Sequence, residues 1–156
     1  MAEAAGAQFS TEELLSSAQG NATAFVLSTI AYLKEHDLAV DDYVRFFGSK
    51  FAPGWEELRD QPIAVARAVA KNAVSVGGTL RSLVGDEEHA EAIIEGWPDE
   101  GISGTLGLRH GEGEAMWDSF EPIMEHLDIL YSWDHEEENG AVRLTFERGR
   151  AYSGLR

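Results

Sequence analysis

Histidines and carboxylates are the side chains of this sequence that could hold a metal ion or exchange protons, and there are 5 of the first and 28 of the second. They gather in two segments, Asp134-His135-Glu136 and His110 with Glu112 and Glu114. Neither segment has the spacing of a His-Glu-x-x-His site or of a calcium loop. Successive residues of a strand point to opposite faces, so His135 would point away from Asp134 and Glu136. We interpret both as solvated polar stretches and expect no metal or other cofactor.

Three other patterns could indicate catalysis or phosphate binding. Asp118, Glu121 and Glu125 share one side of a predicted helix, opposite its apolar stripe, which favours an exposed acidic face over a desolvated acid–base pair. The glycines of 101–107 lack the Gly-Lys-Ser/Thr of a phosphate loop. Ser103 lacks the second glycine of a nucleophile elbow. No catalytic residue is predicted, and an enzyme is the third of three functional hypotheses.

Aromatic residues at the ends of predicted elements are the remaining signal. The sequence has 4 Trp, 4 Tyr and 7 Phe, and aromatic side chains can line a ligand pocket as well as a core. Core packing is the alternative for each ring, above all for Trp117 and Phe120, which lie on a regular helical stripe. The residues singled out as pocket lining are Phe47, Trp97, Tyr131 and Trp133, with Arg81 as a contact for an anion or carboxylate.

The first half of the chain has helical patterning. Ser10 opens a capping box with Glu13 at the start of a short helix. Gly20-Asn21 is expected to end that helix and to separate it from a second helix over 22–36. Asp41 is expected to cap a third helix that ends at Pro53-Gly54. Pro62 fits the first position of a fourth helix, whose small apolar residues over 63–76 predict close approach to its neighbours.

The second half has strand and turn signals. Strands over 79–84 and 90–97 are expected to flank Gly85-Asp86, although 79–84 could instead continue the fourth helix. A glycine-rich loop follows, then a helix over 114–127 that Pro122 should kink or restart. A last hairpin turns at Asn139-Gly140. The prediction is one α+β domain over 1–156, with a bundle of about four helices packed on an antiparallel sheet of two hairpins, one helix between them, and loose ends at 1–8 and 149–156.

Charge and composition exclude several classes of function. The formal charge is −16, and 18 of the 28 acidic residues lie after position 85. Such a chain repels phosphate backbones and anionic lipid, so neither nucleic acid nor a membrane surface is expected as a partner. The chain has no cysteine, which excludes disulfides and thiolate sites. With no visible secretory signal, a cytoplasmic location is expected.

Residues 79–148 resemble the second half of a small α+β group, the 4-vinyl reductase-type small-molecule-binding domains and the aminothiazoline carboxylate hydrolase-like proteins. The resemblance lies in the order of elements and in a strand that ends at Trp97-Pro98, where members of the group often have cysteine. It implies a ligand cavity between the helices and the sheet, and no catalytic residue is carried over.

The leading hypothesis is therefore a domain that binds or senses a small apolar or aromatic ligand without catalysis. The second is a homodimeric interaction module without a ligand. It depends on close helix pairing through 63–76 and on a free sheet edge formed by Val142, Leu144 and Phe146.

Overall fold

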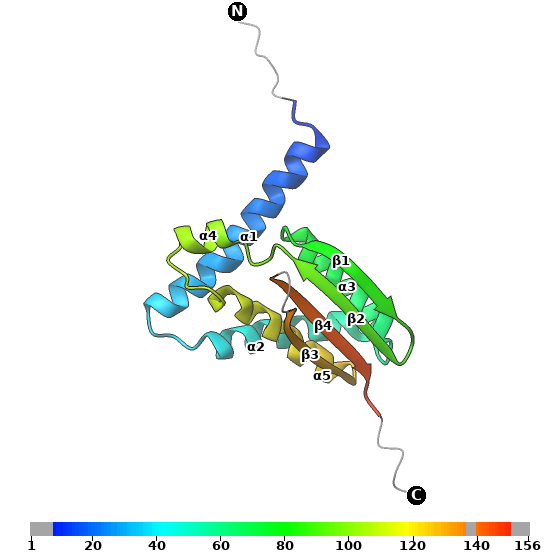
Figure 1. Ribbon diagram of the computed structural model, residues 1–156. Coiled ribbons are helices and arrows are strands. Elements are labelled where there is room, and N and C mark those ends of the chain that lie inside the picture. The colour runs from blue at the N-terminus through cyan, green and yellow to red at the C-terminus, as the bar shows by residue number, and fades with distance from the viewer. Residues whose placement is uncertain (1–7, 137–139, 151–156) are drawn as a thin grey trace, which may run out of the picture.

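A four-stranded antiparallel sheet with helices packed on one face organises the chain (Figure 1). The computed structural model describes residues 8–136 and 140–150. This confirms the predicted α+β class and the two hairpins. The elements are α1 (Thr11–Glu35), α2 (Val40–Phe51), the 3₁₀ helix η1 (Ala52–Leu58), α3 (Pro62–Ser75), β1 (Thr79–Gly85), β2 (His89–Glu95), α4 (Glu100–Thr105), the 3₁₀ helix η2 (Glu112–Phe120), α5 (Glu121–His126), β3 (Ile129–Glu136) and β4 (Ala141–Arg148).

The strand order is β1-β2-β4-β3, so β4 lies inside the sheet between β2 and β3. The expected free edge at Val142, Leu144 and Phe146 is therefore wrong: β4 pairs on both sides, and these side chains are buried. The sequence gives strand periodicity but not strand order, because both outer and inner strands can alternate in this way.

Helix α3 covers the inner face of the sheet, where it contacts β1, β2 and β4. Its small residues Val65, Ala66, Val69 and Ala70 are all buried. The predicted close approach of this helix to its neighbours is thus confirmed, but the neighbour is the sheet of the same chain. These residues are therefore not available to pair with a second copy.

Helix α1 runs unbroken for 25 residues, which corrects the expected break at Gly20-Asn21. A glycine in a helix interior costs only about 1 kcal/mol, and side chains on both sides of it hold the helix against the end of α3. Gln19 Nε2 donates to the Val74 carbonyl at 2.8 Å, and the Thr23 hydroxyl donates to the Val76 carbonyl. The predicted capping box of Ser10 is present.

Other expectations hold in part. Helix α2 begins one residue before Asp41, with Ala39 at the N-cap and no side-chain cap. The segment 114–127 is the 3₁₀ helix η2 followed by α5, which restarts beside Pro122 as predicted. The Gly149 N–H donates to the Asp128 carbonyl at 2.7 Å, so this residue is tied to the end of α5. Asn139, 1–7 and 151–156 lie outside the described residues.

Candidate functional site: an aromatic-walled cavity

An open cavity of about 320 Å³ lies among the helices, beside Trp97, which comes shortly after the end of β2. Its position differs from the expected one between helices and sheet, because its lining includes no residue of β1–β4 among those described. The lining residues are Val26, Phe47, Phe51, Trp55, Asn72, Ala73, Ser75, Val76, Trp97, Met116, Trp117, Ser119, Phe120 and Ile123.

Local sequence explains how the aromatic walls are formed. Phe47 and Phe51 are one helical turn apart in α2, which puts both on one side of it. Pro53 then turns the chain into η1, and the 3₁₀ geometry of η1 brings Trp55 toward the same space. From the other side, η2 contributes Trp117.

The rings contact one another edge to face or tilted within two groups, one on α2 and the other formed by Trp97, Trp117, Phe120 and Trp55. Trp97 and Trp117 are 5.1 Å apart between centroids at 82°, and Phe47 and Phe51 are 4.8 Å apart at 49°. Trp55 meets Phe120 at 6.2 Å. These are favourable aromatic arrangements, and they hold the wall in shape without filling the space between its sides.

The polar groups of the wall are few, and two of them are unsatisfied. Trp97 is 7 % exposed and Trp117 2 % exposed, and the indole N–H of each is buried without a hydrogen-bond partner among the described residues. The Ser119 hydroxyl instead donates to the Met116 carbonyl at 2.6 Å. Since buried donors are rarely left unpaired, these two indoles are unusual features of a wall that otherwise consists of hydrocarbon.

No charged side chain belongs to the lining. The acidic residues Asp118, Glu121 and Glu125, predicted as an exposed face, lie outside the lining, and the side chains of both glutamates are exposed. Arg45 lies 3.2 Å from Glu121 and 3.3 Å from Glu125, and Asp118 accepts a hydrogen bond from Trp133. Burial, and then the charge of Asp118, raise the pKa of Glu121 above its ordinary value. The cavity therefore offers apolar contact and a few neutral polar groups.

Of the five residues predicted to form a site, Phe47 and Trp97 line the cavity and the other three do not. Tyr131 donates to the Trp117 carbonyl at 3.1 Å, and Trp133 Nε1 donates to Asp118 at 2.7 Å. Both side chains thus support η2 from the sheet side. Arg81 is exposed on β1 and lies 3.5 Å from Glu95. It does not line the cavity, so it is not placed to contact the carboxylate of a ligand there.

Four lining aromatics were missing from the predicted set. Phe51 and Trp55 lie beside Pro53-Gly54, and the spacing of Trp117 and Phe120 predicts a regular core stripe. The stripe is real, but η2 is a 3₁₀ helix, whose tighter winding turns part of the stripe toward α2 and the cavity instead of the sheet. The spacing of apolar residues does not reveal that this segment begins as a 3₁₀ helix and continues as an α-helix.

The two histidine–carboxylate segments interleave in space. His135 Nε2 lies 2.9 Å from Glu114, whereas Glu112 pairs with Lys34 at 2.9 Å. His135, Glu114 and His110 belong to a second, more polar hollow of about 470 Å³ beside Trp97. Within residues 8–136 and 140–150, no group of three or more metal-ligating side chains is placed to hold an ion.

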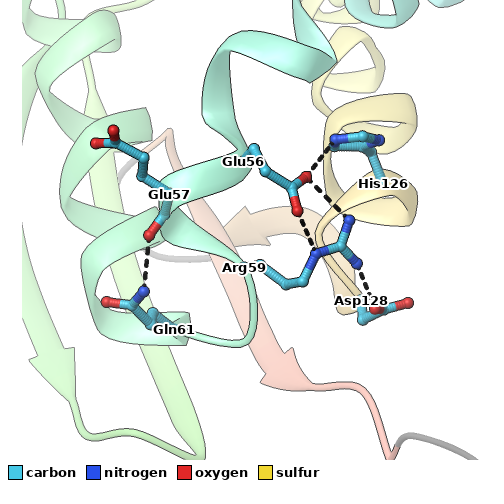
Figure 2. A network of polar contacts seen from close by, with 6 residues as sticks. All are labelled: Glu56, Glu57, Arg59, Gln61, His126 and Asp128. Carbon is cyan, nitrogen blue, oxygen red and sulfur yellow. Dashed lines mark hydrogen bonds and ion pairs between the residues drawn. The ribbon is translucent and has the colours of Figure 1, made fainter.

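A polar network fixes the position of η1, which carries Trp55, relative to α5, which carries Ile123 (Figure 2). Arg59 donates to Glu56 at 2.8 and 3.0 Å and to Asp128 at 2.6 Å. His126 Nε2 lies 2.7 Å from Glu56. The hydrogen bonds from Arg59 are the main cause that lowers the pKa of Glu56.

Comparisons with known proteins identify no relative: no family model, curated protein or solved structure matches the chain. Among the helices of the described residues, none combines the length and the apolar character needed to cross a membrane. The class of protein that can be stated is an α+β domain with an aromatic-walled cavity.

Proposed function

We propose that this protein binds a small, neutral, aromatic or apolar molecule in the cavity walled by Phe47, Trp55, Trp97 and Trp117. The observation that carries the proposal is the open space itself, about 320 Å³ between rings that hold one another at fixed angles. This volume lies at the lower end of the range of ligand sites, roughly 300–1,000 Å³. It fits a molecule of one or two fused rings.

The charges define which ligands are excluded. An anion would enter a lining without a cation, in a chain of formal charge −16. A cation would lose its hydration shell against hydrocarbon without an ion-pair partner, which is costly. A neutral ligand avoids both penalties.

One polar group of the lining favours a ligand that can accept a hydrogen bond. The indole nitrogens of Trp97 and Trp117 are buried and offer no donor to the open space, whereas the amide of Asn72 is exposed and can donate to a ligand there. An aromatic ketone combines a flat apolar body with one acceptor, and it is the simplest probe with these properties.

Thermal unfolding tests the proposal with 2-acetylnaphthalene as the probe and 2-naphthoate as its charged counterpart. At 100 times its dissociation constant, a ligand of the native state adds about 2.7 kcal/mol of stability. For a chain of this size that is a rise in Tm of about 5–10 °C. We expect this rise with the ketone and a much smaller one with the carboxylate.

Two matched variants locate the binding. Ser75→Trp places a large ring at the exposed mouth of the cavity, whereas Ser49→Trp makes the same change at an exposed position of α2 outside the lining. The rise in Tm should disappear in S75W and persist in S49W. Equal rises in both variants, or no rise in the unmodified chain with neutral aromatic probes, would contradict the proposal.

A further inference from the structure

The outward face of helix α1 carries an apolar stripe that no residue of 8–136 or 140–150 covers. Phe25 is 75 % exposed, and Leu14, Leu15 and Tyr32 are each more than half exposed. With about 100° per residue, these side chains cluster on the side of the helix opposite to Thr23, Leu27 and Ile30, which face the body of the protein. We call the outward set, with Ala18 and Ala22, the α1 stripe.

The first turns of α1 also extend beyond the sheet and the other helices (Figure 1). The last side-chain anchor toward the N-terminus is Gln19, which bonds to the Val74 carbonyl. An exposed helical segment of this length is marginally stable in water, because most helical stability comes from packing of an apolar face. The α1 stripe therefore lacks the partner that would make its helix stable.

Hydrogen bonds within the helix make this face less polar than its composition suggests. The hydroxyls of Ser28 and Thr29 both donate to the carbonyl of Phe25, at 3.1 and 2.9 Å. Their polar atoms are thus satisfied by their own helix. Burying this part of α1 against another surface leaves those two hydroxyls paired.

We propose that the α1 stripe is the contact between two copies of this chain, packed as an antiparallel helix pair. In such a pair, residues at equal distances on either side of Gly20 lie opposite each other, and they are matched in size. Leu15 of one copy lies opposite Phe25 of the other, and Ala18 lies opposite Ala22. The small pair at the centre lets the two backbones approach, and the large pair closes each end.

Charge favours a second copy over other occupants. From Leu14 to Leu33 the chain has no charged residue, although its formal charge is −16, so two copies meet here with the least repulsion. A basic partner would instead be attracted to the acidic second half of the chain. A lipid surface is disfavoured because surface-binding helices are typically rich in Lys and Arg, whereas α1 has Glu12 and Glu13 in its first turn and one lysine.

The exposed area limits this contact to a weak, reversible dimer. The four large side chains expose roughly 500 Å² per copy, so about 1,000 Å² is the most that they can bury in a dimer. In this arrangement Tyr32 lies opposite Gln8, before the helix of the second copy begins at Thr11, so it adds little to the contact. The interface is thus at the lower limit of specific ones, and we expect association only at high protein concentration.

Sedimentation equilibrium from about 1 to about 200 µM tests the proposal. The mass should rise from the 17.1 kDa of one chain toward twice that value. Phe25→Asp should weaken the association at least about tenfold. The matched control is Phe46→Asp, which changes another exposed phenylalanine, 60 % exposed on α2, and should leave the association unchanged. Circular dichroism establishes that both variants are folded.

A second experiment uses the absence of cysteine in the chain. The double variant Ala18→Cys with Ala22→Cys should form a covalent dimer on mild oxidation. The pair Ser16→Cys with Ala24→Cys is also symmetric about Gly20, but its members lie farther from Gly20 and on other sides of the helix, so it should not form this dimer. A monomer at every concentration would overturn the proposal, as would a dimer that F25D leaves intact. A monomer that sediments with neutral or anionic lipid vesicles through α1 would assign the stripe to a membrane surface and overturn it equally.

Discussion

Replacing Gly48 by alanine tests how α2 is held against η2, the two elements that form opposite walls of the cavity. Gly48 is buried in the interior of α2, and a Cβ there would overlap the carbonyl oxygen of Ser119 and lie 3.2 Å from Cδ of Pro122. Main-chain atoms cannot rotate away as a side chain can. The substitution must therefore push α2 and η2 apart.

The magnitude follows from two opposing effects. Alanine is a better helix former than glycine by about 1 kcal/mol, which would stabilise α2. Overpacking against a fixed neighbour costs roughly 1–3 kcal/mol, and overlap with a main-chain atom puts Gly48→Ala at the upper end. The free energy of unfolding should fall by about 2 kcal/mol, which lowers Tm by about 4–8 °C.

Gly20→Ala is the matched control, because it makes the same change inside a helix. A Cβ at Gly20 meets no atom within 4 Å, so only the gain in helix propensity remains. Urea denaturation should show G20A more stable by up to about 1 kcal/mol and G48A less stable. If G48A is as stable as the unmodified chain, the close contact between α2 and η2 is wrong, and so is the wall that depends on it.

Three further predictions concern the groups that support the cavity. Trp133→Phe removes the hydrogen bond to Asp118 and should lower the free energy of unfolding in urea by about 2 kcal/mol; an unchanged value would mean that the bond does not hold η2. Because hydrogen bonds from Arg59 lower the pKa of Glu56, ionised Glu56 stabilises the fold above its pKa in the unfolded chain, about 4.3. That contribution is lost as the pH falls through the lower folded pKa, so E56Q should lose less stability than the unmodified chain between about pH 5 and pH 3, and parallel curves would refute this. Burial, and then the charge of Asp118, raise the pKa of Tyr131 well above 10, so an absorbance titration should show one tyrosine ionising only as the fold is lost in alkali. This last step should be missing in Y131F, and its persistence there would assign it to another tyrosine.

The fold followed from local signals wherever a residue type demands one backbone conformation. Pro62 starts α3, and Gly140, which has a positive φ of 66°, lies in the last hairpin turn. Prediction failed where tertiary contacts decide the outcome. Gly20 indicated a break, but hydrogen bonds from Gln19 and Thr23 to the end of α3 keep α1 continuous.

The candidate site was predicted only in part, for a related reason. Trp97 was found because an aromatic residue near the end of an element often faces a space between elements, whereas Phe47 lies within α2, one helical turn before Phe51. Tyr131 and Trp133 met the same criterion, but alternation in β3 turns both toward η2, where their polar atoms find partners. Trp117 was assigned to the core, since its spacing does not reveal the 3₁₀ helix that turns it toward α2.

The central claim is that the cavity binds a neutral aromatic ligand, and the indole N–H signals of the 4 tryptophans test it most directly. Trp55, Trp97 and Trp117 line the cavity, whereas Trp133 is bonded to Asp118 outside it and acts as an internal control. In a ¹⁵N–¹H correlation spectrum titrated with 2-acetylnaphthalene, the three lining signals should shift and saturate together while that of Trp133 stays in place. A spectrum in which no indole signal moves, or in which Trp133 moves as far as the others, would contradict the account.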